Sequence, residues 1–168
     1  VKLYRSGFHG HEAEASALRL LEGRGVAPSL IRVVDHDQRR GLVLERLHGS
    51  DMLTLLQREP WRLVSLARDL AEAHLRIHEI EAPDSLPDLR DVLSHRIHRA
   101  PLPSHLREFA LRELTLLPGG DRLAHGDYHP GNVLFARDQH AVIDWTAASR
   151  GAPEADHART MLLLRWAD

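Results

Sequence analysis

The sequence predicts an α/β protein, more narrowly an α+β arrangement of two lobes. Residues 1–49 are expected to form a small β-rich lobe together with the hinge between the lobes, and residues 50–168 a mainly helical lobe. Three observations predict it. Short β-rich runs dominate the first 46 residues, apolar residues recur at helical spacing after Gly49, and two apolar runs near residue 140 flank a polar turn. A chain of 168 residues suits one domain, or two small lobes around one core.

The first lobe is predicted to have the order β-α-β-β. Residues 1–4 are typical of a strand, and a helix is expected over about residues 11–21, with acidic side chains in its first turn. Two β-rich runs follow at 31–34 and 42–46. The polar segment 37–41 between them predicts a hairpin.

The second lobe is predicted to be built from helices. Ser50 and Ser104 are candidate N-caps, and Pro60 fits the first turn of a long helix. The helices are expected over about residues 51–57, 60–80, 88–98, 105–116 and 153–167.

Composition narrows the functional classes. The 22 basic and 24 acidic side chains give a net charge of −2, which gives no support to nucleic-acid binding. No apolar run approaches a membrane span, and no secretory signal is visible, so a cytoplasmic protein is expected. The absence of cysteine excludes disulfides, thiolate metal sites and cysteine nucleophiles.

The most informative segment is HGDYHPGNVLF at residues 125–135, followed by AVIDW at 141–145. A hairpin centred on Asp138 would pair Asn132 with Asp144, with their Cα atoms about 5 Å apart. Asp127 lies in the loop that enters the first strand. Three oxygen-bearing side chains are therefore expected to converge at one end of this hairpin.

Those three side chains suit phosphoryl transfer. One amide and one carboxylate oxygen, from Asn132 and Asp144, are ligands that Mg²⁺ accepts. A second carboxylate beside the metal, that of Asp127, could orient a hydroxyl group and take its proton. Phosphoryl transfer needs little more than this placement and neutralisation of charge.

The segment resembles the aminoglycoside phosphotransferase and choline kinase family, which has the protein-kinase-like fold. The family's catalytic loop reads H-G-D-x-H-x-x-N and its metal motif I-D-W, which match HGDYHPGN and VIDW here. The resemblance implies that Asp127 is the catalytic base, that Asn132 and Asp144 hold Mg²⁺, and that the phosphate donor is ATP. The acceptor would be a hydroxyl group of a small molecule.

The resemblance extends over most of the chain. Val1–Arg5 looks like the family's third strand, with Lys2 as the lysine that holds the nucleotide phosphates. Glu14 looks like the helix glutamate that pairs with this lysine, and Glu12 is the alternative partner. LVLERLHG, with Glu45 and Leu47, looks like the hinge that receives adenine. Asp156 looks like the aspartate that braces the catalytic loop.

The family has two strands and a nucleotide-covering loop ahead of the lysine strand, and this sequence does not contain them. The resemblance therefore implies a reduced N-terminal lobe, and we expect the sequence to be a piece of a longer protein. The strand edge left unpaired in such a lobe could join a second chain in a dimer.

The 13 histidines allow other interpretations of the chemistry. His74 and His78 lie four residues apart on the long helix and could chelate zinc or nickel, but a packing role is favoured. His125 is expected to support the catalytic loop, and His129 could touch the metal-binding carboxylate. Three alternative functions stay open: a degenerate kinase-like scaffold that binds nucleotide without turnover, a metal-assisted hydrolase, and a kinase that acts on proteins.

Overall fold

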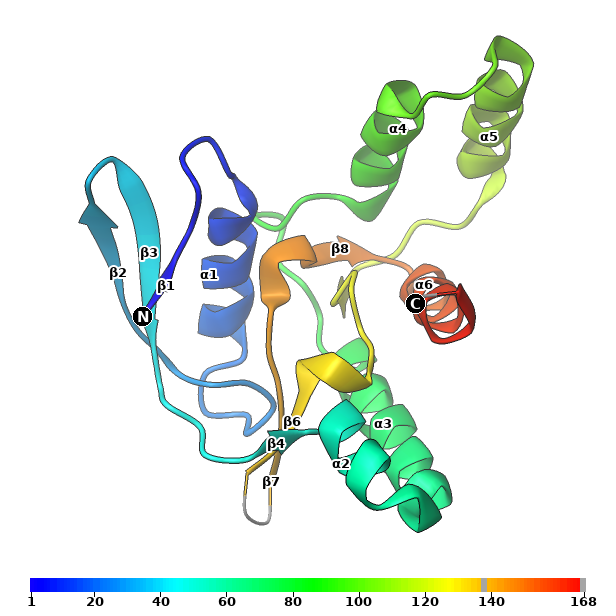
Figure 1. Ribbon diagram of the computed structural model, residues 1–168. Helices are drawn as coiled ribbons and strands as arrows, with labels where there is room; N and C mark the ends of the chain where they lie inside the picture. The colour runs from blue at the N-terminus through cyan, green and yellow to red at the C-terminus, as the bar shows by residue number, and fades with distance from the viewer. Residues whose placement is uncertain (137–138, 167–168) are drawn as a thin grey trace.

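The computed structural model describes residues 1–136 and 139–166 and has a mixed α/β architecture (Figure 1). Its strands form three small antiparallel sheets. The first has the order β1-β3-β2, the second β4-β6-β7, and the third pairs β5 with β8. The strands are β1 (Lys2–Leu3), β2 (Leu30–His36), β3 (Arg39–Leu44), β4 (Ser50–Asp51), β5 (Arg122–Ala124), β6 (Val133–Ala136), β7 (Gln139–Val142) and β8 (Ser149–Gly151).

The first sheet and α1 (Gly10–Leu20) confirm the predicted β-α-β-β order. Ala17 and Leu18 of α1 are buried, and they pack in one core cluster with Leu42 of β3. Helix α1 also packs against a 3-10 turn at Trp145–Ala147 (η3), which brings an early and a late segment of the sequence together. Strands β1 and β2 form the edges of this sheet, and the dimer expected through such an edge stays a prediction.

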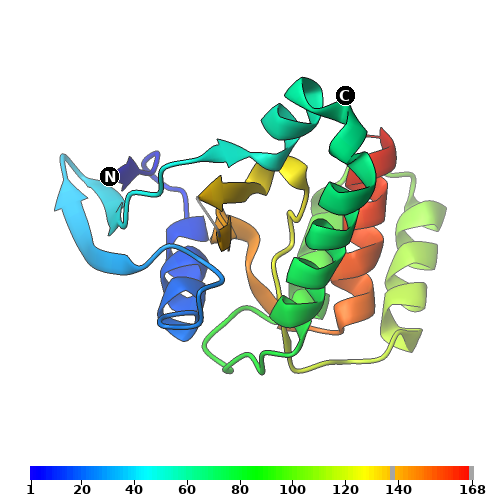
Figure 2. The same ribbon diagram turned by 90° about the horizontal axis from the view of Figure 1, so that it is seen from below.

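The helices after residue 50 lie at the other end of the molecule, and Figure 2 shows α3 (Leu63–His78) and α6 (Pro153–Trp166) side by side there. Most of their bounds are within two residues of those expected. None of the described helices is long and apolar enough to cross a membrane. They are α2 (Met52–Arg58), α3 (Leu63–His78), α4 (Leu89–Arg99), α5 (Ser104–Leu116) and α6 (Pro153–Trp166).

Three helix starts differ from the prediction. Asp51, not Ser50, caps α2, because its carboxylate accepts from the Thr54 N–H at 2.8 Å while Ser50 pairs with Phe135 in the second sheet. Pro60–Arg62 forms a separate 3-10 turn (η1), so α3 begins only at Leu63. Ser104 is the first residue of α5, and the cap position is Pro103.

The register of the β6–β7 hairpin also differs from the prediction. Val133 pairs with Val142 and Ala136 with Gln139, so two residues connect the strands, and the expected centre at Asp138 lies outside the described residues. This register differs from the predicted one by one residue, which shifts every pair by one position. Asn132 therefore lies opposite Ile143, whose N–H donates to its carbonyl at 2.9 Å. The predicted pairing of Asn132 with Asp144 is wrong by one residue.

Candidate active site

Lys2 joins two acidic side chains from distant parts of the chain. Its Nζ atom donates to Glu14 Oε2 at 2.7 Å and Oε1 at 3.0 Å, and to Asp144 Oδ1 at 2.9 Å. Glu14 is only 1 % exposed, and the Tyr4 hydroxyl also donates to its carboxylate. The rival Glu12 lies in solvent beside His11. The structure therefore places Glu14 beside Lys2, the pairing that the resemblance implies, leaves Glu12 out, and adds a contact of Lys2 with Asp144 that the sequence did not predict.

Asp144 reaches Lys2 because the backbone turns sharply after β7. Asp144 has φ 63° and ψ 60°, a left-handed conformation that few non-glycine residues adopt. Strained backbone of this kind is concentrated at functional sites. Partial burial favours a raised pKa for the Asp144 carboxyl group, but hydrogen bonds from Lys2 and Thr146 outweigh it and hold that pKa below its usual range. Asp144 is therefore a carboxylate near neutral pH.

The loop that carries Asp127 is closely packed. Gly126 has φ 76°, and a Cβ atom there would lie 2.4 Å from the Ala147 carbonyl oxygen, so only glycine fits. His125 is fully buried, with its Nε2 atom 3.0 Å from the Ile143 carbonyl and its Nδ1 atom accepting from the Asp127 N–H. These contacts fit a neutral imidazole, and burial lowers the pKa of His125. His125 thus supports the loop.

Asp127 itself is 39 % exposed at the side chain. Its backbone carbonyl accepts from Asn132 Nδ2 at 2.9 Å. Its Oδ1 atom accepts from Arg159 at 3.2 Å, and its Oδ2 atom lies 3.9 Å from His129 Nε2. Arg159 was missed by sequence reasoning, and only its position one turn after Asp156 could have drawn attention to it. His129 lies beside Asp127, and no contact with Asp144 is found among the described residues.

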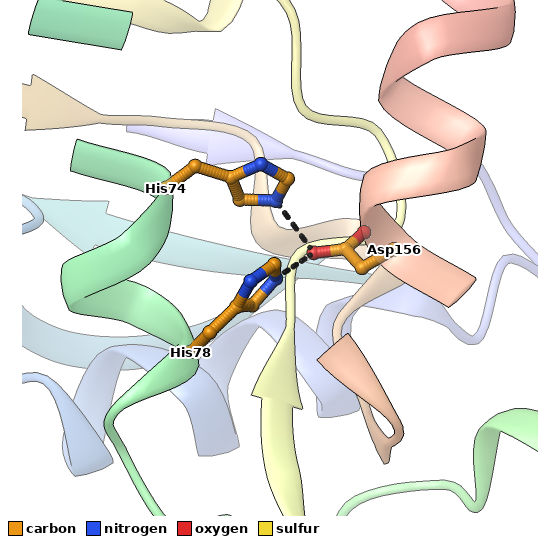
Figure 3. Close-up of side chains that lie close together, drawn as sticks. All are labelled: His74, His78 and Asp156. Atoms are coloured by element: carbon orange, nitrogen blue, oxygen red, sulfur yellow. Dashed lines mark hydrogen bonds and ion pairs between the residues drawn. The ribbon is translucent and has the colours of Figure 1, made fainter. Parts of the chain in front are cut away.

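Asp156 connects the loop to two helices. Its Oδ2 atom accepts from His74 Nε2 (3.0 Å) and His78 Nε2 (3.1 Å) and from the backbone N–H of His125 (2.9 Å), while its Oδ1 atom accepts from the Gly126 N–H (2.8 Å). Figure 3 shows both imidazoles, on α3, pointing at this one carboxylate on α6. Burial favours a raised pKa for Asp156, but the histidine hydrogen bonds hold that pKa far below its usual range.

His74, His78 and Asp156 have ligand atoms within 4.8 Å of one another, a spacing at which three side chains can bind one metal ion. Both Nε2 atoms already have a hydrogen-bond partner, because each is bound to the Asp156 carboxylate. The i, i+4 spacing of the histidines is therefore explained by bracing of the loop without a metal. Sequence reasoning identified the pair, but could not show that its partner is Asp156.

Burial of His74 and His125 predicts a pH dependence of stability. Burial lowers the pKa of His74 more than its Asp156 contact raises it, and burial lowers that of His125. Between the folded-state pKa and the ordinary value of 6.5, the unfolded chain binds more protons, so stability is full above pH 6.5 and falls with acidification below it. Each proton contributes a slope of at most about 1.4 kcal/mol per pH unit.

Urea denaturation between pH 7.5 and 5.5 measures this slope. The His74→Gln variant should show a smaller slope than the parent, because one of the two buried imidazoles is gone. The exposed His95 provides the matched control, and His95→Gln should leave the slope unchanged. A parent whose free energy of unfolding does not change over this range would contradict the assignment of neutral, buried histidines.

A pocket of about 300 Å³ opens beside Lys2. The predicted hinge residues Glu45 and Leu47 lie on its wall. The Glu45 carboxylate is already bound by Ser29, through the backbone N–H and the hydroxyl at 3.1 Å each. The exposed side chain of Glu45 is therefore held by Ser29. The pocket is lined by Lys2, Glu14, Pro28, Leu44, Glu45, Leu47, Leu134, Ile143 and Asp144.

The fold and the lysine–glutamate–aspartate cluster beside a His-Gly-Asp loop are those of the protein-kinase-like class. The chain belongs to the phosphotransferase enzyme family, whose model matches residues 1–168. It is similar to streptomycin 6-kinase of Streptomyces glaucescens, with 33 % identity over 79 % of this chain and 45 % of the relative. Streptomycin 6-kinase of Streptomyces griseus is 32 % identical over 68 % of this chain and 40 % of the relative. The chain thus spans less than half the length of both.

Proposed function

We propose that this protein transfers the γ-phosphoryl group of ATP to a hydroxyl group of a small molecule. One observation carries the proposal. Lys2 Nζ contacts both Glu14 and Asp144, which gathers β1, α1 and the segment after β7 around one cation. A scaffold has no need of this charged cluster beside a pocket. Phosphoryl transfer depends on such a cluster to place the nucleotide phosphates.

The nucleotide would lie in the pocket beside Lys2. Residues 1–49 then act as the nucleotide-binding lobe and hinge, and residues 50–168 as the catalytic lobe. Leu44 and Leu47 offer apolar walls for adenine. Because Ser29 holds the Glu45 side chain, the hinge would meet adenine with its backbone at Glu45 and Leu47. Lys2, held by Glu14, would bind phosphate oxygens.

Asn132 and Asp144 fit a magnesium ion. The amide nitrogen of Asn132 is committed to the Asp127 carbonyl, which leaves its amide oxygen as the atom that can bind a cation. Asp144 is an ionised, half-exposed carboxylate. Both atoms are hard oxygen ligands. When bound, Mg²⁺ would neutralise charge on the phosphates.

Asp127 is proposed as the general base. Its carboxylate is exposed enough to meet an acceptor, and it would orient the acceptor hydroxyl and take its proton as the oxygen attacks the γ-phosphorus. The bond to the γ-phosphorus forms as the bond to the ADP oxygen breaks, and no other reactant is required.

The acceptor is proposed to be a small polar molecule with a free hydroxyl group. The relatives' names point to streptomycin as one probe. Choline-like alcohols and amino-alcohols are the others, because the motif resemblance covers both branches of the family. The cytoplasmic location expected from the sequence stays a prediction.

The magnesium assignment predicts an order of effects. Asp144→Ala should weaken the affinity for Mg·ATP by at least about tenfold, and more than Asn132→Ala, because it removes a charged ligand rather than a neutral one. Calorimetry with a non-hydrolysable ATP analogue, with and without Mg²⁺, measures both. Asp91→Ala, an exposed charge on α4, is the control. If Mg²⁺ leaves the analogue's affinity in the parent unchanged, the metal assignment is wrong.

A further inference from the structure

Helix α6 holds the catalytic loop with two side chains that lie one turn apart. Asp156 accepts from the Gly126 N–H, and Arg159 Nε donates to the Gly126 carbonyl. The backbone N–H and the carbonyl group of Gly126 are therefore both bound by side chains on the same face of α6. The remaining end of the Arg159 guanidinium, Nη2, donates to Asp127 Oδ1 at 3.2 Å. Arg159 thus connects the backbone of the loop to the one carboxylate on it that faces solvent.

The contact distinguishes the two oxygens of Asp127. Oδ1 is bound by Arg159, whereas Oδ2 has no hydrogen bond to any of the described residues, and His129 Nε2 lies 3.9 Å from it, beyond hydrogen-bond distance. We propose that Arg159 is a positioning residue that fixes the Asp127 carboxylate, so that Oδ2 is presented to the acceptor hydroxyl. This inference rests on the proposed function, in which Asp127 is the base.

The exposure of the pair favours positioning over a purely structural role. The side chains of Arg159 and Asp127 are 42 % and 39 % exposed, and ion pairs of this exposure add little to stability. The planar fork of an arginine presents several nitrogens in a rigid geometry and can hold two acceptors with separate nitrogens, whereas a lysine offers a single nitrogen on a flexible stem. The two contacts of Arg159 use this property, because one reaches the backbone and the other the carboxylate.

Steady-state kinetics of the full-length protein test the proposal. Arg159→Ala should lower kcat by about tenfold to a hundredfold, the size expected when a reacting group is misplaced, while KM for ATP stays within about threefold. Arg159→Lys should recover only part of this loss. The melting temperature should fall by no more than about a few degrees, because the hydrogen bonds lost, to the Gly126 carbonyl and to Asp127, are only partly buried. Arg165→Ala, an exposed arginine two turns along α6, is the control and should match the parent.

A double-mutant cycle identifies the route of the effect. Because Arg159 acts through Asp127, Arg159→Ala should cost little further kcat in an Asp127→Asn background. Fully additive losses, or an Arg159→Ala variant with the parent's kcat, would overturn the positioning role.

An NMR measurement separates this inference from the proposed function. In the ¹⁵N-labelled parent, rotation of the Arg159 guanidinium about its Nε–Cζ bond should be slow, with separate Nη signals. In Asp127→Ala these signals should merge, while the Nε–H signal, held by Gly126, should persist. Unchanged Nη signals in Asp127→Ala overturn the inference even if turnover is found. A parent that phosphorylates nothing refutes the proposed function, and the NMR result still decides whether Arg159 fixes the carboxylate.

Discussion

Replacing Asp127 by asparagine is expected to lower kcat by about 10²- to 10⁴-fold, which corresponds to roughly 3 to 5 kcal/mol of activation free energy. Asparagine keeps the size of the side chain but loses the charge that orients the acceptor hydroxyl and receives its proton. Because this carboxylate is assigned to the acceptor, and the Lys2 cluster to the nucleotide, the dissociation constant for Mg·ATP should stay within a few-fold.

The measurement needs the full-length protein and a panel of aminoglycosides, choline-like alcohols and amino-alcohols. Asp121→Asn, which changes a half-exposed aspartate paired with Arg122, is the matched control and should retain the parent's kcat. Phosphorylation by Asp127→Asn at the parent rate would rule out the base assignment. A parent that binds Mg·ATP but phosphorylates nothing on the panel would favour the hypothesis of a scaffold that binds nucleotide without turnover.

Replacing Asp156 by alanine is expected to lower the free energy of unfolding by about 3 to 5 kcal/mol, as when one partner of a buried ionic network is removed. The carboxylate is 2 % exposed and accepts hydrogen bonds from two backbone N–H groups and two imidazoles. Its removal leaves four donors without their acceptor in a buried place, and each such group carries a desolvation penalty. Urea denaturation at pH 7.5 measures the loss.

The control is Glu154→Ala, which removes an exposed carboxylate from the same first turn of α6 and should change stability by less than about 0.5 kcal/mol. If Asp156→Ala fails to fold, the milder His78→Gln removes only one donor and should still destabilise the protein measurably. Hydrogen exchange of residues 125–127 should then rise in His78→Gln. Parent-like stability in both variants would contradict the bracing role.

Local pattern was sufficient where neighbouring residues decide the structure. The helical spacing of Leu66, Leu70, Ala73 and Ile77 predicted α3, and all four are buried. The helix ends were less predictable, because a cap depends on which side chain reaches a free N–H. Ser50 and Asp51 are both good caps by type, but α2 begins at Met52, so Asp51 directly precedes it and its carboxylate reaches the Thr54 N–H.

The hairpin shows how a small local choice alters a site prediction. Apolar alternation indicated two strands but not the number of residues in the turn, and one residue changes every partner. Asn132 and Asp144 are therefore not opposite each other. Asp144 takes a left-handed backbone after the strand and meets Lys2 instead.

The sequence by itself determined the chemistry that is available: a His-Gly-Asp loop, an amide and a carboxylate flanking a hairpin, and a lysine and glutamate near the start. Only the tertiary structure decided which groups meet. Lys2 and Asp144 are 142 positions apart, and His74 and Asp156 are 82 positions apart. Contacts of this length depend on how α1, α3 and α6 pack around the loop. Periodicity reports which face of an element is buried, but not which side chain it faces.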